Sequence, residues 1–144
     1  MMLHAIERGE GRPLALLHGL FGHAGNFGVV QREFSRRFRV LALDLRNHGE
    51  SAHADGMSYA SMAADVLETL RAHGALPCTM IGHSMGGKVG MALALASPEA
   101  VSRLVIADIA PVAYGHGMRG YVEAMRAIPL SRLTGPRRFS SAVR

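Results

Sequence analysis

Short apolar runs alternate with longer segments of helical periodicity along this 144-residue chain. Five runs predict β-strands, at residues 3–7, 13–18, 39–44, 78–83 and 103–108. Several are almost entirely apolar, as expected of strands that are covered on both faces of a parallel sheet. The alternation therefore predicts an α/β fold, with a mostly parallel sheet of about five strands and flanking helices.

The segments between the strands predict helices over residues 26–38, 58–73 and 85–97, with one more amphipathic helix over 120–128. Asn26 and Ser58 are the predicted N-caps of the first two, since their side chains can accept hydrogen bonds from the first turn. The inner face of the first helix is predicted from helical spacing to hold Phe27, Val30, Phe34 and Phe38.

Composition places the chain among soluble globular proteins. The hydrophobic fraction is 49% and the charged fraction 19%, and no uncharged apolar run approaches the roughly 18 residues of a membrane span. Charged residues at positions 7, 8, 10 and 12 interrupt the region where a secretory signal has its apolar stretch. We therefore expect a cytoplasmic protein with no membrane partner. The single cysteine, Cys78, has apolar neighbours and is expected to be a buried small hydrophobe.

Charge divides the chain at residue 118. Acidic and basic side chains balance before that point, so the whole formal charge of +5 comes from the arginine-rich residues 119–144. We interpret residues 1–118 as the core of the domain, and 119–144 as a helix followed by a solvated, poorly ordered tail. Basic tails can bind nucleic acid, but no aromatic interleaving accompanies these arginines, so we expect no specific nucleic-acid binding.

The stretch "IGHSMGG" at residues 81–87 places Ser84 between Gly82 and Gly86. Gly-x-Ser-x-Gly between an apolar strand and a helix is typical of a nucleophile elbow, a sharp turn that projects the serine hydroxyl above the sheet. A side chain at either glycine would collide with the neighbouring strand or helix. The alternative is a chance match in a glycine-rich chain. The strand before the motif and the helix after it favour Ser84 as a catalytic nucleophile.

A second stretch, "LLHGLFG" at residues 16–22, ends a strand with His-Gly and is similar to loops that complete an oxyanion hole. Such a hole needs two N–H donors aimed at the oxygen that becomes negative. The expected pair is the backbone N–H of Met85 with that of Leu20, and Phe21 is the second choice for the latter. His18 is expected to brace this loop by hydrogen bonding.

Three motifs together resemble the α/β-hydrolase superfamily: "HGLFG" at 18–22, "DLRNHGES" at 44–51 and "GHSMGGK" at 82–88, with "VIADIAP" at 105–111 in support. The branch that the chain resembles, from its first strand to about residue 128, is that of small serine esterases and acyl-thioester hydrolases. The resemblance implies that Asp44, Arg46 and His48 order the loop at 44–51.

The resemblance also implies a catalytic acid and a histidine after the nucleophile in chain order. Asp108 follows the last predicted strand, 24 residues after Ser84, and in the esterase branch the acid lies at this point. The alternative is that Asp108 only caps the turn before Pro111. His116 is not expected to be the base, because the family's histidine follows a much later strand. We therefore expect an N-terminal fragment that is largely inactive by itself, since serine without a base is a poor nucleophile.

The sequence thus predicts a hydrolase of carboxylic esters or thioesters that works through an acyl-serine intermediate, with no cofactor and no metal. Lactonase, carbon–carbon hydrolase and perhydrolase chemistry remain open, because the lid that sets acyl specificity is mostly missing. A non-catalytic fragment or binding module is the alternative from another class. The sequence contains no signal that predicts whether the protein is a monomer or an oligomer.

Overall fold

The computed structural model describes residues 1–113 and 119–129. The chain divides into two compact units, Met1–Pro111 and Val112–Arg144. The elements of the first unit are β1 (Ala5–Arg8), β2 (Arg12–Leu17), η1 (Ala24–Phe27), α1 (Gly28–Phe34), β3 (Phe38–Leu43), α2 (Tyr59–Ala72), β4 (Cys78–His83), α3 (Met85–Ala96), η2 (Pro98–Ala100) and β5 (Val101–Ala107). The second unit contributes α4 (Arg119–Arg126), where the sequence predicts a helix at 120–128. The predicted boundary at residue 118 stays a prediction.

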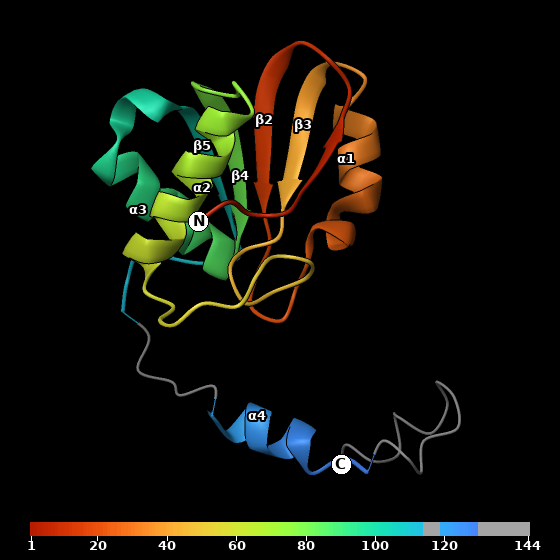
Figure 1. Ribbon diagram of the computed structural model, residues 1–144, viewed down its shortest axis with the longest axis vertical. Coiled ribbons are helices and arrows are strands. Elements are labelled where there is room, and N and C mark those ends of the chain that lie inside the picture. Colours follow the sequence, from red (N-terminus) through yellow and green to blue (C-terminus); the bar gives the residue numbers. More distant parts are fainter. Residues whose placement is uncertain (114–118, 130–144) are drawn as a thin grey trace. The chain divides into compact units, whose positions relative to one another are not determined.

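The five strands form one sheet in the order β1-β3-β2-β4-β5. Strand β1 pairs antiparallel with β3, and the other three pairings are parallel. The predicted mostly parallel sheet of about five strands is therefore confirmed (Figure 1). Strands β2 and β4 are neighbours, so their carboxyl ends, which lead to the two glycine motifs, meet at one edge of the sheet.

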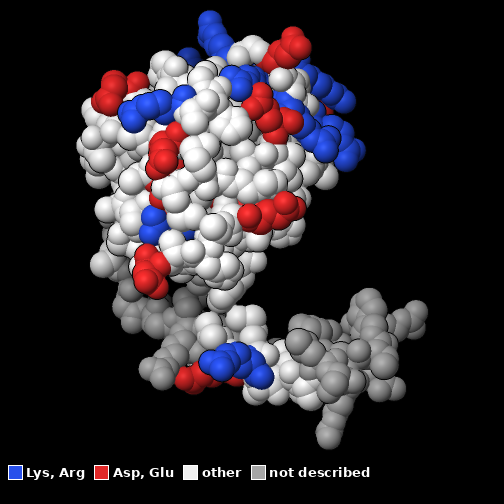
Figure 2. All heavy atoms as spheres, viewed as in Figure 1, with Lys and Arg blue, Asp and Glu red and all other residues white. Residues whose placement is uncertain are grey.

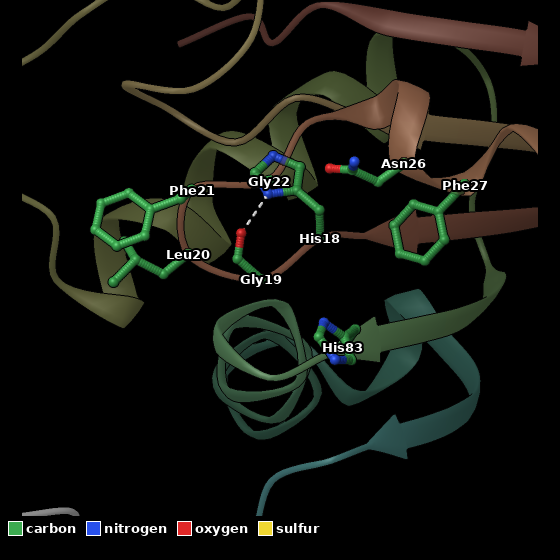
Figure 3. A pocket seen from close by; sticks show the side chains of 8 residues that line it. All are labelled: His18, Gly19, Leu20, Phe21, Gly22, Asn26, Phe27 and His83. Carbon is green, nitrogen blue, oxygen red and sulfur yellow. Dashed lines mark hydrogen bonds between the residues drawn. The ribbon is translucent and has the colours of Figure 1, made fainter. Parts of the chain in front are cut away.

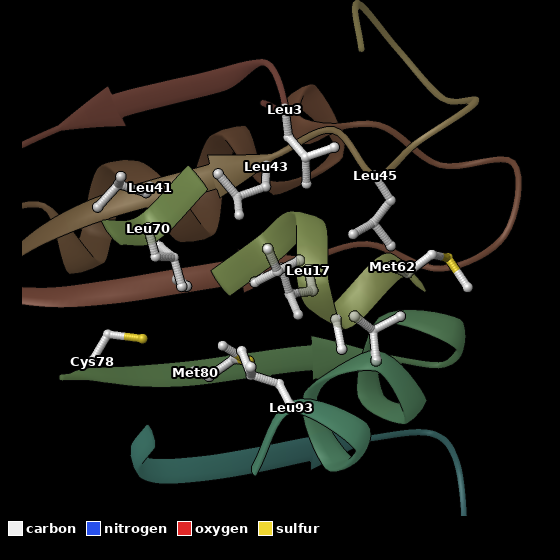
Figure 4. Packing of buried hydrophobic residues seen from close by; sticks show 14 of the residues in the cluster. Leu3, Leu17, Leu41, Leu43, Leu45, Met62, Leu70, Cys78, Met80 and Leu93 are labelled. Atoms are coloured by element: carbon white, nitrogen blue, oxygen red, sulfur yellow. The ribbon is translucent and has the colours of Figure 1, made fainter. Parts of the chain in front are cut away.

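Helices cover both faces of the sheet, with α2 and α3 on one side and α1 on the other (Figure 1). Alternate residues of the central strands supply the two cores, because successive side chains of a strand point to opposite faces. The larger core packs Leu17 and Leu41 against Val66 of α2 and Leu93 of α3 (Figure 4). The smaller core packs Leu14, Leu16, Val40, Ala42, Phe27 and Phe34 on the other face.

Helix α2 begins where the sequence predicts. The Ser58 side chain accepts a hydrogen bond from the Ser61 N–H at 3.0 Å, which caps the helix. Its buried face includes Met62, Val66 and Leu70, spaced at one helical turn. Cap and apolar stripe are both local signals, which is why the prediction holds here.

The predicted helix over 26–38 is wrong in its cap and its length. A short 3₁₀ turn precedes α1, and His23 caps that turn: its Nδ1 accepts the Gly25 N–H at 3.2 Å, while the Asn26 side chain accepts the His23 N–H at 2.7 Å. Val30 is 39% exposed, so it does not belong to the buried face. Phe38 begins β3, because its pairing with Arg12 in the sheet replaces the last helical turn.

Helix α3 approaches the sheet closely through small residues. A Cβ on Gly87 would lie 2.8 Å from Ile109 Cγ2, and a Cβ on Gly90 would lie 2.9 Å from Leu104 Cδ1. Within the described residues β5 is an edge strand, and its Val105 is 50% exposed. The sheet therefore presents an apolar edge on the side of β5.

Surface charges of both signs lie side by side on the face seen in Figure 2. Some are paired, as in Arg39 with Glu7 at 2.6 Å and Arg36 with Glu33 at 3.0 Å.

In the described part of the chain, no helix has both the length and the apolar character that a bilayer span requires. Cys78 is buried as predicted, and burial raises the pKa of its thiol to about 11.

Candidate active site

Ser84 occupies the turn between β4 and α3 in a backbone conformation that few non-glycine residues adopt. Its φ is +50° and its ψ −116°. Its N–H donates to the Ala107 carbonyl at 2.9 Å, which fastens the turn to the end of β5. A strained residue of this kind persists only where the surrounding structure holds it, and such residues cluster at functional sites.

The two glycines of the motif leave room for this turn. A Cβ on Gly82 would lie 2.6 Å from the carbonyl carbon of Gly86. A Cβ on Gly86 would lie 2.6 Å from the carbonyl carbon of Leu17 and 2.7 Å from the carbonyl oxygen of His18. These neighbours are main-chain atoms of the elbow and of the adjacent strand, so neither position accommodates a side chain without moving the backbone.

The loop after β2 forms a tight turn beside the serine. The Gly22 N–H donates to the Gly19 carbonyl at 3.0 Å, and Phe21, the third residue of the turn, has a φ of +61°. This is the pattern of a type II turn. A Cβ on Gly19 would lie 3.2 Å from the Ser84 Cβ, so the turn packs directly against the serine.

The backbone N–H groups of this region differ in what they bind. Among the described residues, the N–H groups of Leu20 and Met85 donate to no protein group, as expected of donors kept for a ligand. The Phe21 N–H instead donates to His48 Nε2 at 3.3 Å. Of the two candidates in this loop, Leu20 therefore has the available donor.

His18 is buried and holds the turn from the end of β2. Its Nε2 accepts the Leu45 N–H at 3.0 Å, and its Nδ1–H donates to the Gly19 carbonyl at 2.8 Å. Burial lowers the pKa of His18, which favours the neutral ring that these two bonds require. His18 therefore braces the loop as predicted.

The loop at 44–51 is ordered by its own polar residues. Asp44 accepts the N–H groups of Ala24 at 2.5 Å and Glu50 at 2.9 Å, and although burial opposes the effect, these bonds lower the pKa of Asp44. Arg46 binds the buried Asp65 of α2 through two nitrogens, at 2.5 and 2.8 Å. The expected ordering role of these residues is confirmed.

Asp108 follows β5 at the same edge of the sheet as Ser84. Its φ is +59° and its side chain is 85% exposed. Of the imidazoles that the structure describes, the nearest to it is that of His83, whose Nε2 lies 3.6 Å from a carboxylate oxygen of Asp108. Among the described residues, no hydrogen bond joins the Ser84 hydroxyl to a histidine. His116 lies outside the described residues.

A cleft of about 350 Å³ opens beside the turn (Figure 3). Its apolar wall is formed by Leu20, Phe21 and Phe27, and its polar groups come from Asn26 and His83. A second cleft, of about 450 Å³, lies on the other side of the turn against His48 and Met57. In the part of the chain that the structure describes, no three metal-ligating side chains come together.

Residues 12–139 match the family model described as the alpha/beta hydrolase fold. The chain belongs to the α/β-hydrolase family. The sn-1-specific diacylglycerol lipase ABHD11 of Xenopus laevis is 47% identical over 122 residues, which are 82% of this chain and 39% of the lipase. The esterase YbfF of Escherichia coli is 44% identical over 102 residues, covering 71% of this chain and 40% of the esterase. This chain therefore spans about two-fifths of the length of these curated relatives.

A solved structure of a marine microorganism esterase superposes on this chain with a TM-score of 0.88 and 36% identity. The superposition covers 99% of this chain and 57% of the esterase chain. The relatives are esterases and lipases, so the family assignment made from the three motifs is confirmed, as is the fold.

Sequence reasoning missed two contacts at the candidate site. His48 was expected only to order its own loop, but it also accepts the Phe21 N–H of the glycine turn. His83, the residue before the nucleophile, faces Asp108 and lines the first cleft. Both contacts join residues at least 25 positions apart in the sequence, and a local motif carries no signal for them.

Proposed function

We propose that this chain carries the nucleophile and the oxyanion hole of a serine hydrolase that cleaves carboxylic esters or thioesters. The observation that supports the proposal most is the backbone of Ser84, a non-glycine residue at φ +50° with the Gly19–Gly22 turn packed against it. The relatives named as esterase and lipase support an ester as the substrate class.

In the proposed reaction, the Ser84 oxygen attacks the carbonyl carbon of the ester while a base takes the hydroxyl proton. The electron pair of the carbonyl moves onto its oxygen, which the Leu20 and Met85 N–H groups would bind as a developing oxyanion. Collapse of the tetrahedral intermediate breaks the bond to the alkoxide or thiolate, which leaves with the proton. Water then hydrolyses the acyl-serine by the same steps and releases the acid.

The cleft beside the turn supports a substrate with an apolar arm. Leu20, Phe21 and Phe27 offer hydrocarbon surface, whereas the polar groups of the cleft are few. This composition suits the acyl or alcohol chain of a small uncharged ester. We infer no particular acyl length from it.

The proposed acid is Asp108, which would orient a histidine on the family's pattern. Since the described residues offer Ser84 no imidazole partner, we propose that the 144-residue chain acylates slowly. Loss of the base costs on the order of a million-fold in serine proteases. Free imidazole added to the buffer would then raise the rate by acting as the base that the described residues do not offer to Ser84.

The test is labelling of the purified chain with a fluorophosphonate probe, with and without imidazole, followed by peptide mass spectrometry. We expect labelling at Ser84 that imidazole accelerates, no labelling of Ser84→Ala, and unchanged labelling of the control Ser102→Ala, whose side chain is exposed on β5. Turnover of a short p-nitrophenyl ester should follow the same pattern. A chain that stays unlabelled in imidazole would favour the non-catalytic binding module instead.

A further inference from the structure

The turn that carries the Leu20 N–H cannot hold its shape through its own contacts. One backbone hydrogen bond, from Gly22 to Gly19, closes it. Phe21 sits at φ +61°, a conformation that is strained for a non-glycine residue. The Phe21 side chain is 55% exposed, so its burial contributes little to offset that strain. Something outside the turn must hold Phe21 in place.

His48 supplies that contact from the loop at 44–51. Its Nε2 accepts the Phe21 N–H at 3.3 Å, and its Nδ1–H donates to the Arg46 carbonyl at 2.9 Å. The two bonds together require a neutral ring with its proton on Nδ1. Arg46 is itself fixed by the two hydrogen bonds that its guanidinium donates to the buried Asp65, so His48 ties the turn to a rigid support.

Leu20 lies between two peptide groups, and each peptide group forms a hydrogen bond with a histidine side chain. The plane before it contains the Gly19 carbonyl, which accepts from His18 Nδ1–H, and also the Leu20 N–H. Because N–H and C=O point in opposite directions across a trans peptide, fixing that carbonyl directs the Leu20 N–H. The plane after it contains the Phe21 N–H, which His48 holds. The two rings lie 5.1 Å apart.

We propose that His48 is a positioning residue for the oxyanion hole: by holding the Phe21 N–H, it fixes the plane after Leu20 and keeps the Leu20 N–H aimed at the reacting oxygen. This proposal rests on the proposed function, since it takes Leu20 as the oxyanion donor. His48 touches no reacting atom in this role.

Three variants separate positioning from a general structural role. His48→Leu removes the acceptor, and His48→Gln places an amide oxygen near the position of Nε2. His53→Leu is the matched control, because His53 is exposed on the same segment. For each protein, the rate of Ser84 modification is measured against fluorophosphonate concentration in imidazole buffer, which separates probe affinity from the maximal rate. The midpoint of urea unfolding reports stability in parallel.

For His48→Leu we expect the maximal rate to fall about 10- to 100-fold with the probe affinity unchanged, since displacement of a catalytic group by about 1 Å can cost 100-fold. His48→Gln should recover at least part of the rate, and His53→Leu should match the wild type. An unchanged maximal rate in His48→Leu overturns the proposal, and so does a loss of rate that Gln does not recover in a protein of wild-type stability.

The ¹H–¹⁵N spectrum distinguishes failure of this proposal from failure of the proposed function. We expect the Phe21 and Leu20 amide signals to shift in His48→Leu and the exchange of the Phe21 amide with solvent to accelerate at least 10-fold. Should the wild type remain unlabelled, the proposed function fails, and the amide signals still report whether His48 holds the turn. Unchanged Phe21 exchange in His48→Leu overturns the positioning role whatever the labelling shows.

Discussion

Substitution of Gly86 by alanine tests the packing of the nucleophile elbow against β2. The added methyl group would lie 2.6 Å from the carbonyl carbon of Leu17, whereas ordinary contacts begin at 3.4 Å. The Leu17 carbonyl oxygen would lie closer still, so the backbone must separate by more than about 0.8 Å at this point. Leu17 belongs to a central strand that is paired on both sides, so the sheet resists that movement.

The expected cost follows from two opposing effects. Overpacking of a rigid site costs about 1–3 kcal/mol, and we expect the upper end because the obstacle is main chain. Alanine gains up to about 1 kcal/mol over glycine in a helix. The net loss of unfolding free energy in Gly86→Ala is then about 2 kcal/mol. With a urea slope of about 2 kcal/mol per molar, the midpoint falls by about 1 M.

Gly28→Ala is the matched control. Gly28 has helical angles of −51° and −41°, and a Cβ there would have no neighbour within 4 Å. We expect this variant to gain about 0.5–1 kcal/mol. Far-ultraviolet circular dichroism in urea measures both variants, because the chain has no tryptophan for fluorescence. A midpoint of Gly86→Ala at or above that of the wild type would refute the packing of α3 described above.

Three further predictions concern buried groups. Arg46→Met should lower the unfolding free energy by about 3 kcal/mol, because it removes the guanidinium from the buried Asp65 carboxylate and leaves the Met1 ammonium as its charged partner. Arg36→Met at an exposed pair should change it by at most about 1 kcal/mol, and equal urea midpoints for the two variants would contradict this. Although burial opposes the effect, hydrogen bonds from Arg46 and from the Met1 ammonium lower the pKa of Asp65 below 3.8, so wild-type stability should be complete above that pH and fall as pH drops through the lower folded-state pKa; Arg46→Met should make this decline smaller. Cys78, with a pKa of about 11 against 9.0, should react with iodoacetamide at least about 100-fold more slowly in the folded protein than in urea, and comparable rates would show that the thiol is accessible.

Much of the fold could be predicted because its signals are local. The apolar runs give all five strands within two residues of their observed ends. Ser58 caps α2 as its side chain and position suggest. The segment after residue 22 is the exception: His23 and Asn26 form a reciprocal cap there, and histidine is not among the usual capping residues. Phe38 leaves the helix because strand pairing outweighs its helical spacing.

Some parts of the candidate site could also be predicted from local sequence signals, and other parts could not. Gly82, Ser84 and Gly86 could be recognised because the crowding of a strand-to-helix turn restricts residue types within five consecutive positions. The sequence ranked Leu20 before Phe21 on the position of the loop alone, and it gave no sign of the physical reason, which is the bond from the Phe21 N–H to His48, 27 residues away. The proximity of His83 to Asp108 likewise depends on the pairing of β4 with β5.

The sequence by itself determined the strands, the turn at Ser84 and the family, and it predicted Ser84 as the nucleophile, because each rests on a short-range pattern of residue size and polarity. The tertiary structure alone decided which N–H groups beside Ser84 stay available and which histidines hold the turn. Those assignments depend on the register of β2 against β3 and β4, which brings the loops after these strands together at one edge of the sheet. Hydrogen bonds between loops form only once that register is set, and no local sequence pattern specifies them.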